Sequence, residues 1–226
     1  MGMAVLCITS VQAQTVDDII NKHIEAIGGK EKLSQAKSLY IENSMEAMGN
    51  QSPSTEYILE GKGYKSESEF NGMKIINTYT DKGGWSINPL AGGADAQAMP
   101  DEVYKSGKDQ IYIGGSLVDY AAKGNKAELT GKEGNDYKIK ITNGSTVTDY
   151  FIDATTYYIT KTSVKGEMMG QSVEIVTTFS DYKKTDFGIV LPYTKSIDFG
   201  GFALTFKRNK VEVNKEIDPK IFETPK

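Results

Sequence analysis

Apolar and polar residues alternate with a period of two along most of this chain, beginning at Leu39. Such alternation is typical of β-strands that bury one face and leave the other in water. In the first run one face carries Leu39, Ile41, Met45 and Ala47, and the other carries Tyr40, Glu42, Ser44 and Glu46. The pattern returns in five later runs, at residues 57–59, 73–75, 137–141, 173–179 and 202–206.

Short turn sequences separate these runs, among them Asn71-Gly72, Asp81-Lys82-Gly83-Gly84 and Asn143-Gly144. Short connections between consecutive strands favour an antiparallel meander. The pattern therefore predicts a mainly β fold with one antiparallel sheet of about eleven strands, and a twisted sheet of that size tends to curl or close.

Helical periodicity appears in two places outside these runs. Residues 15–29 predict a helix with Thr15 as N-cap, an apolar stripe of isoleucines, and Gly28-Gly29 at its C-terminal end. A second short helix is expected at residues 30–37. In the middle of the chain, residues 90–115 lose the period of two, and Pro100 predicts the start of a helix with a weak point at Gly107. We expect these helices to cover one face of the curved sheet.

Length and charge indicate how many domains the chain forms and which partners it lacks. A chain of 226 residues without a linker or a tandem repeat suits one domain. It carries 26 basic and 30 acidic residues, a formal net charge of -4, and its lysines are scattered. This distribution predicts no nucleic-acid partner.

The N-terminus is a short apolar run that ends in Val11-Gln12-Ala13. This pattern predicts a signal peptide at residues 1–13, cleaved before Gln14, and a single exported domain at 14–226. An outer-membrane lipoprotein anchored through Cys7 is less favoured, because Ala4-Val5-Leu6 lacks the small residue expected just before a lipidated cysteine. Cys7 is the only cysteine, so cleavage would leave no thiol for a disulfide, a metal site or a nucleophile.

Chemistry-bearing motifs are absent from the sequence. It contains no nucleophile elbow, no paired-histidine zinc motif and no phosphate-binding glycine loop. Any histidine-dependent site would depend on His23 alone, and we interpret His23 as a boundary residue of the amphipathic helix. The sequence therefore predicts no catalytic residue, no metal ligand and no cofactor.

The face expected to point inward carries wide, soft apolar side chains, and methionine adapts to irregular partners. Met168-Met169 adds to it from a strand end. Asn43, Asn77 and Lys195 also have inward parity, and an amphiphile's headgroup or acyl ester could satisfy them. The predicted ligand-binding residues are Met45, Met73, Ile75, Trp85, Ile87, Leu90, Lys195, Phe199 and Phe202. The alternative is an ordinary filled core, in which Trp85 would be an anchor.

Several segments of the chain closely resemble the outer-membrane lipoprotein-sorting proteins, the LolA/LolB-like periplasmic family. They are Asp17 to Ile20, His23, Ala26 to Gly29, Lys32-Leu33, Gly84 to Pro89, Asp153 to Thr156, Gly188 and Leu191-Pro192. The resemblance covers nearly the whole mature chain, and its motifs are structural. It implies an open, half-closed antiparallel β-barrel, covered by helices, whose apolar concave face receives lipid or lipoprotein acyl chains.

Three functional hypotheses follow. The first is a non-enzymatic periplasmic carrier or binder of acyl chains that makes transient contact with a membrane surface or an envelope protein. The second is an envelope protein-interaction or sensing module on the same scaffold, with its cavity filled by its own side chains. The third is an enzyme, such as a hydrolase that uses His23.

Overall fold

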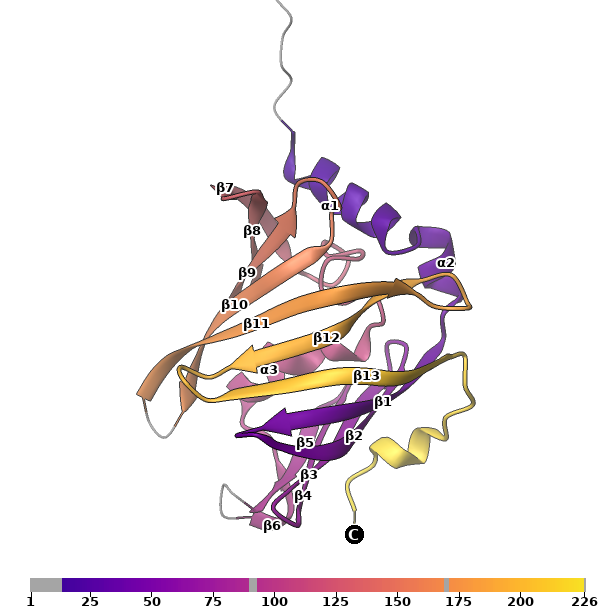
Figure 1. Ribbon diagram of the computed structural model, residues 1–226, viewed down its shortest axis with the longest axis vertical. Helices are drawn as coiled ribbons and strands as arrows, with labels where there is room; N and C mark the ends of the chain where they lie inside the picture. The colour runs from indigo at the N-terminus through magenta and orange to yellow at the C-terminus, as the bar shows by residue number, and fades with distance from the viewer. Residues whose placement is uncertain (1–13, 90–92, 169–170, 226) are drawn as a thin grey trace, which may run out of the picture.

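The computed structural model describes residues 14–89, 93–168 and 171–225. Its main feature is a single antiparallel sheet of thirteen strands in the order β6-β5-β4-β3-β2-β1-β13-β12-β11-β10-β9-β8-β7 (Figure 1). The strands are β1 (Ser38–Ala47), β2 (Asn50–Leu59), β3 (Gly63–Phe70), β4 (Met73–Thr80), β5 (Gly84–Asn88), β6 (Gly93–Ala98), β7 (Lys126–Glu133), β8 (Asp136–Asn143), β9 (Thr146–Asp153), β10 (Ile159–Met168), β11 (Gln171–Lys184), β12 (Val190–Asp198) and β13 (Ala203–Val213). The mainly β prediction is confirmed, with two strands more than the count of about eleven.

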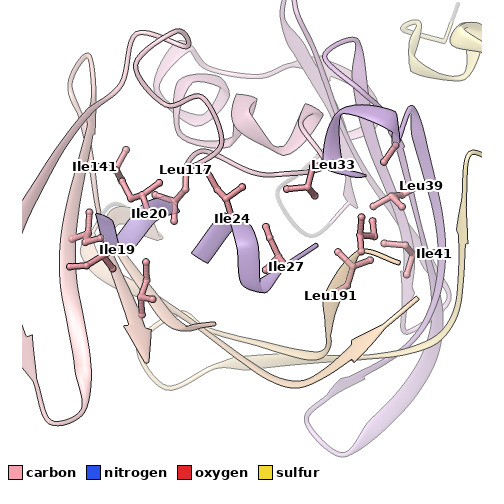
Figure 2. Close-up of a cluster of buried hydrophobic side chains, with 14 residues drawn as sticks. Ile19, Ile20, Ile24, Ile27, Leu33, Leu39, Ile41, Leu117, Ile141 and Leu191 are labelled. Atoms are coloured by element: carbon pink, nitrogen blue, oxygen red, sulfur yellow. The ribbon is translucent and has the colours of Figure 1, made fainter. Parts of the chain in front are cut away.

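The sheet curves into a trough but does not close, because β6 and β7 are its two edges and do not pair with each other. Neighbouring strands are also neighbours in sequence, except that β1 pairs with β13 and so joins the two ends of the strand sequence. Figure 2 shows the sheet bending around the first helix. The predicted open barrel is thereby confirmed.

Helix α1 (Val16–Ala26) begins and ends where its sequence indicates. The amide of Asp18 donates to Thr15 Oγ1 at 3.1 Å, and the Thr15 amide donates to Asp18 Oδ2 at 2.9 Å, which together form a capping box. At the other end Gly28 and Gly29 have φ of 126° and 83°, which L side chains adopt only with strain.

The apolar stripe of α1 fills the trough. Ile19, Ile20 and Ile24 are buried and belong to the main core cluster (Figure 2). The sheet contributes Leu39 and Ile41 from β1 to the same cluster. Other sheet and loop members are Leu117, Ile139, Ile141, Ile152, Ile189 and Leu191. The expected packing of an amphipathic helix on the curved sheet is confirmed.

A second helical segment packs on the concave face near β3 and β4. Helix α3 (Asp101–Gly107) follows Pro100 and passes at Gly107 into the 3-10 helix η2 (Lys108–Ile111), so the predicted start and weak point are both found. Ile111 packs with Tyr64 of β3 and Tyr79 of β4 in a second core cluster. The short helix α2 (Lys30–Gln35) ends two residues before the predicted boundary.

The sequence pattern does not predict strand β6. Residues 93–98 belong to the segment that is expected to lack strand periodicity and to lead into the helix at Pro100, but they form β6 and pair with β5. The segment is Gly-Ala-Asp-Ala-Gln-Ala, whose only apolar side chains are alanines, and their alternation with Asp95 and Gln97 is a weak strand signal because alanine is depleted in strands.

The C-terminal segment crosses the convex side of the sheet. The 3-10 helix η3 (Pro219–Phe222) lies outside the trough (Figure 1), and the Phe222 ring occupies the space above Gly63, where a Cβ atom would be 2.6 Å from its Cγ. Trp85 Nε1 donates a hydrogen bond to the Phe222 carbonyl oxygen at 2.9 Å. We call residues 219–222 the C-terminal strap.

Candidate functional site

The concave face divides into two halves. At the end near α1 and α2, the two core clusters fill it with protein side chains. The opposite end is formed by the hairpin between β1 and β2 and by that between β12 and β13 (Figure 1). The members of the two clusters do not include residues of this end. There the strand register places a set of apolar side chains on the concave face, all but one of them only partly buried. We call this set the open half: Met45, Met73, Ile75, Val164, Val173, Ile175, Phe179, Ile197, Leu204 and Phe206.

Six of the nine predicted ligand-binding residues lie in or beside the open half. Met45 is 3% exposed and pairs across strands with Phe206, and Met73 and Ile75 share its face through β2 and β3. Lys195 pairs with Phe206 from the other side. At the hairpin that follows β12, the rings of Phe199 and Phe202 are 6.3 Å apart.

Trp85 and Ile87 lie on the convex face, contrary to the inward orientation expected for them. Trp85 pairs with Thr78, and Ile87 pairs with Ile76, whereas the concave residues of β4 are Ile75 and Asn77. The turn before β5 joins odd positions to even ones, and a shift of one residue moves every side chain to the other face. Trp85 is 5% exposed beneath the C-terminal strap, so its surroundings are those of a core anchor. Its role in ligand binding stays a prediction that this orientation does not support.

Leu90, the ninth predicted residue, lies outside the described residues, and so do Met169 and the side chain of Met168. The predicted signal peptide at residues 1–13 is also outside them.

Three polar side chains form a row across adjacent strands at the boundary of the open half. Asn43 of β1 pairs with Ser54 of β2 on one side and with Arg208 of β13 on the other. Both amide atoms of Asn43, Ser54 Oγ and Arg208 Nη1 are buried and have no hydrogen-bond partner. An unpaired buried polar group costs about 1–3 kcal/mol, so native proteins keep few of them. We call Ser54, Asn43 and Arg208 the polar row.

A buried ion pair lies beside the polar row. Lys195 Nζ is 3.0 Å from Glu56 Oε1, and the two side chains are 20% and 5% exposed. Lys195 also lies 4.9 Å from the centre of the Phe206 ring. Because β12 and β2 are separated by β13 and β1, this pair reaches across the trough.

The charges of this region perturb two pKa values. Burial alone would raise the pKa of Glu56, but the positive charges of Lys195 and Arg208 outweigh it and hold that pKa below its usual range. Burial, and then the negative charge of Glu56, raises the pKa of the Tyr64 hydroxyl well above its usual value. At neutral pH this region therefore holds an ionised Glu56 carboxylate and a neutral Tyr64 phenol, beside the side chains of Lys195 and Arg208.

Sequence reasoning missed three members of this group, namely Ser54, Glu56 and Arg208. The alternating run at residues 57–59 has Tyr57 and Leu59 as its apolar positions and so predicts these two to face inward, whereas the register gives the inward side of β2 to Ser54, Glu56 and Ile58. One signal was available, because Arg208 is the only arginine of the chain and lies in an alternating strand.

His23 is buried and is not a boundary residue. It is 3% exposed, and its Nδ1 donates to the Tyr157 carbonyl oxygen at 2.7 Å. Burial lowers the pKa of His23, although the bond to Tyr157 acts in the opposite direction. His23 therefore joins α1 to the segment between β9 and β10, and its geometry is structural.

A hollow of about 480 Å³ lies between α1 and residues 117–122. Its floor includes Ile20, Ile24 and Leu117 from the main core, and Asp17 and Lys30 are among the polar residues that line it. The volume falls within the range of small-molecule pockets. None of the nine predicted ligand-binding residues lines this hollow.

The described ranges contain no group of three or more His, Cys, Asp or Glu side chains placed to hold a metal ion. Within the same ranges, no helix has both the length and the apolar character needed to span a bilayer.

No protein-family model matches the sequence, and no curated protein matches it. The fold, in contrast, matches solved structures over nearly their full length. A LolA superfamily protein from Nitrosomonas europaea superposes with a TM-score of 0.61 at 10% identity, over 94% of this chain and 99% of that one. The chain has the LolA fold.

Two further structures agree with this result. A DUF1329 family protein from Desulfovibrio piger gives a TM-score of 0.61 at 13% identity, over 93% of this chain and 98% of that one. A domain assigned to an outer membrane lipoprotein-sorting protein from Vibrio parahaemolyticus gives 0.52 at 12% identity, over 90% and 97%. At these identities the likeness concerns the LolA fold alone, and it confirms the architecture that the sequence resemblance implied.

Proposed function

We propose that the protein is a non-enzymatic carrier or binder of lipid or lipoprotein acyl chains in the periplasm. The observation that carries the proposal is the open half, a set of concave apolar side chains that belong to neither core cluster. Binding becomes more favourable by about 25 cal/mol for each Å² of partly exposed apolar surface that a ligand removes from water. The likeness to lipoprotein-sorting and LolA superfamily folds supports the same proposal.

Strand β11 supplies a matched pair of variants for testing this site. Ile175 faces the trough, and its neighbour Val176 faces the convex side, and both are half-buried. We expect Ile175→Gln to weaken uptake of a fluorescent fatty acid about tenfold, because a polar amide replaces apolar contact in the ligand site. Val176→Gln should bind like the wild type. If both variants bind the fatty acid like the wild type, or if both lose binding, the open half is not the ligand site.

A second candidate function is an envelope protein-interaction or sensing module. The observation that favours it is the filled end of the trough, where Ile19, Ile41 and Ile152 are fully buried by protein. Native mass spectrometry of protein purified from a Gram-negative host separates the two functions. Co-purified lipid supports the carrier, whereas absence of any lipid together with no fatty-acid uptake supports the interaction module.

The enzyme hypothesis receives no support from the site geometry. Its one candidate residue, His23, is enclosed between α1 and the Tyr157 backbone, and the hydrogen bond to that backbone engages its Nδ1. A hydrolase would need the imidazole to reach a substrate.

A further inference from the structure

The polar row is the one place in the described residues where several unpaired buried polar atoms belong to directly paired positions. Asn43 contributes two of them, and its cross-strand partners Ser54 and Arg208 contribute one each. The other unpaired atoms of this kind belong to Thr78, Asn125 and Asp149, none of which is paired across strands with another of them. Because such atoms are rare in native proteins, a cluster of four on adjacent strands indicates a site for a polar ligand group.

The charge of this region indicates which group would bind. Glu56 neutralises Lys195 through their 3.0 Å contact. Arg208 takes part in none of the ion pairs found among the described residues, so its charge is the one left over. A guanidinium group presents a planar set of donors that fits the oxygens of a carboxylate or a phosphate. The complement of the row is therefore a single negative charge.

The hydrogen-bonding inventory agrees with this choice. Asn43 Nδ2, Ser54 Oγ and Arg208 Nη1 can all donate to the oxygens of an anion. Asn43 Oδ1 is the only atom among the four that must accept, and a hydroxyl or amide next to the anionic group would satisfy it.

The row also borders the open half in the correct order for an amphiphile. Along β1, Asn43 is followed on the same face by Met45, and along β13, Arg208 is followed by Phe206. The Lys195 side chain is 20% exposed, so the boundary between the row and the open half is in contact with solvent. A ligand with its charged end at the row would extend its chain over Phe206 and Leu204, which are only partly buried.

We infer that the polar row binds the anionic headgroup, a carboxylate or a phosphate, of an amphiphile whose acyl chain lies on the open half. This inference rests on the proposed function and adds the chemical class of the ligand to it.

The test compares probes that share one chain and differ in headgroup. Oleate, 1-oleoyl lysophosphatidate and the neutral oleyl alcohol are titrated into the full chain, with displacement of a fluorescent fatty acid as the readout. We expect at least one anionic probe to bind about tenfold or more tightly than oleyl alcohol, because hydrogen bonds to charged groups are the strong ones. The tighter of the two anionic probes identifies the headgroup as a carboxylate or a phosphate.

Two variants assign that preference to the row. Arg208→Gln should abolish the preference for the anion and leave the affinity for oleyl alcohol unchanged. Lys207→Gln is the matched control, because Lys207 is the exposed neighbour on the convex face and carries the same charge. Asn43→Leu removes two of the unpaired atoms without changing the charge, so it tests the row even if Arg208→Gln does not fold. It should weaken the anionic probes alone.

The outcomes separate the two proposals. Equal affinity of all three probes for the wild type, or an anion preference that survives Arg208→Gln and Asn43→Leu, overturns the headgroup site and leaves the acyl-chain binder in place. Failure of every probe to bind overturns the proposed function itself.

Discussion

At the scale of single residues, Lys195 compensates the negative charge of a buried carboxylate, Glu56, on the concave face. Its ammonium group is the closest cation to Glu56, a carboxylate that is 5% exposed and has almost no water to stabilise it. Removing one partner of a buried ion pair leaves an uncompensated charge, which is far more costly than the pair itself is favourable.

We predict that Lys195→Met lowers the free energy of unfolding by about 2–3 kcal/mol at pH 7, below the full range for buried pairs because Lys195 keeps some contact with water. Urea denaturation measures the change. The same substitution should raise the pKa of Glu56, since burial then acts against the charge of Arg208 alone.

Lys210→Met is the control for this prediction. Lys210 lies 3.8 Å from Glu42 with half of its side chain exposed, and exposed pairs contribute about 0–1 kcal/mol. Equal losses in the two variants would show that the Glu56 pair has no special role in stability.

At the scale of elements, the sequence predicted helices and long strands well because their side-chain patterns are local. The isoleucine stripe and the capping box define α1, and the alternation from Leu39 to Ala47 defines β1 with the correct face inward. Periodicity also placed Lys195 and Asn43 on the concave side, as the register shows. Each of these inferences needs only the residues of one element.

Relations between elements could not be read in this way. Whether Trp85 faces the trough depends on which residue of β4 pairs with it, and that is decided by the turn at 81–83 and by long-range packing. Likewise, the cover over Trp85 comes from Phe222, which is 137 positions away along the chain. The grouping of Ser54, Asn43 and Arg208 requires the pairing of β2, β1 and β13, which no local pattern specifies.

The C-terminal strap gives a prediction at this scale. Gly63 has an ordinary backbone conformation, so alanine is excluded there only by the Phe222 ring, whose Cγ would lie 2.6 Å from the new Cβ. We predict that Gly63→Ala displaces the strap, shifts Trp85 emission to the red and lowers the free energy of unfolding by about 1–3 kcal/mol, as overpacking does. Because Trp85 is the only tryptophan, its fluorescence reports on the strap directly.

Gly93→Ala serves as the matched control, since a Cβ at Gly93 meets nothing closer than 3.5 Å. It should leave the emission unchanged. Phe222→Ala should reproduce the red shift by removing the ring itself. An unchanged emission in both Gly63→Ala and Phe222→Ala would mean that the strap does not shield Trp85.

At the scale of the whole molecule, an open sheet must be closed by something other than strand pairing. The β7 edge carries the exposed charges of Lys126, Glu128 and Lys132, which discourage edge-to-edge association. The main core depends on α1, whose isoleucines fill the trough between the two edges. Any condition that weakens the attachment of α1 should therefore expose the main core cluster.

Acidification is one such condition, and His23 is the group that should sense it. Burial lowers the pKa of His23 in the folded protein relative to its ordinary value of 6.5, so the unfolded chain takes up the proton first. The contribution of His23 is therefore fully present above pH 6.5 and is lost as the pH falls toward the lowered pKa. We predict that the free energy of unfolding declines between pH 6.5 and 5 by at most about 1.4 kcal/mol per pH unit. Urea denaturation across this range measures it, and hydrogen exchange should show residues 16–26 losing protection with acid.

His23→Asn is the variant that isolates this effect, because its amide can still donate to the Tyr157 carbonyl oxygen but does not titrate. The chain has one histidine, so no other side chain has its ordinary pKa within this window. Burial raises the pKa of Glu60, so any slope from that carboxyl is common to both proteins, and the variant should lose only the part of the decline that His23 contributes. A wild-type decline that persists unchanged in His23→Asn would assign the acid sensitivity to other groups and leave α1 without a pH-dependent attachment.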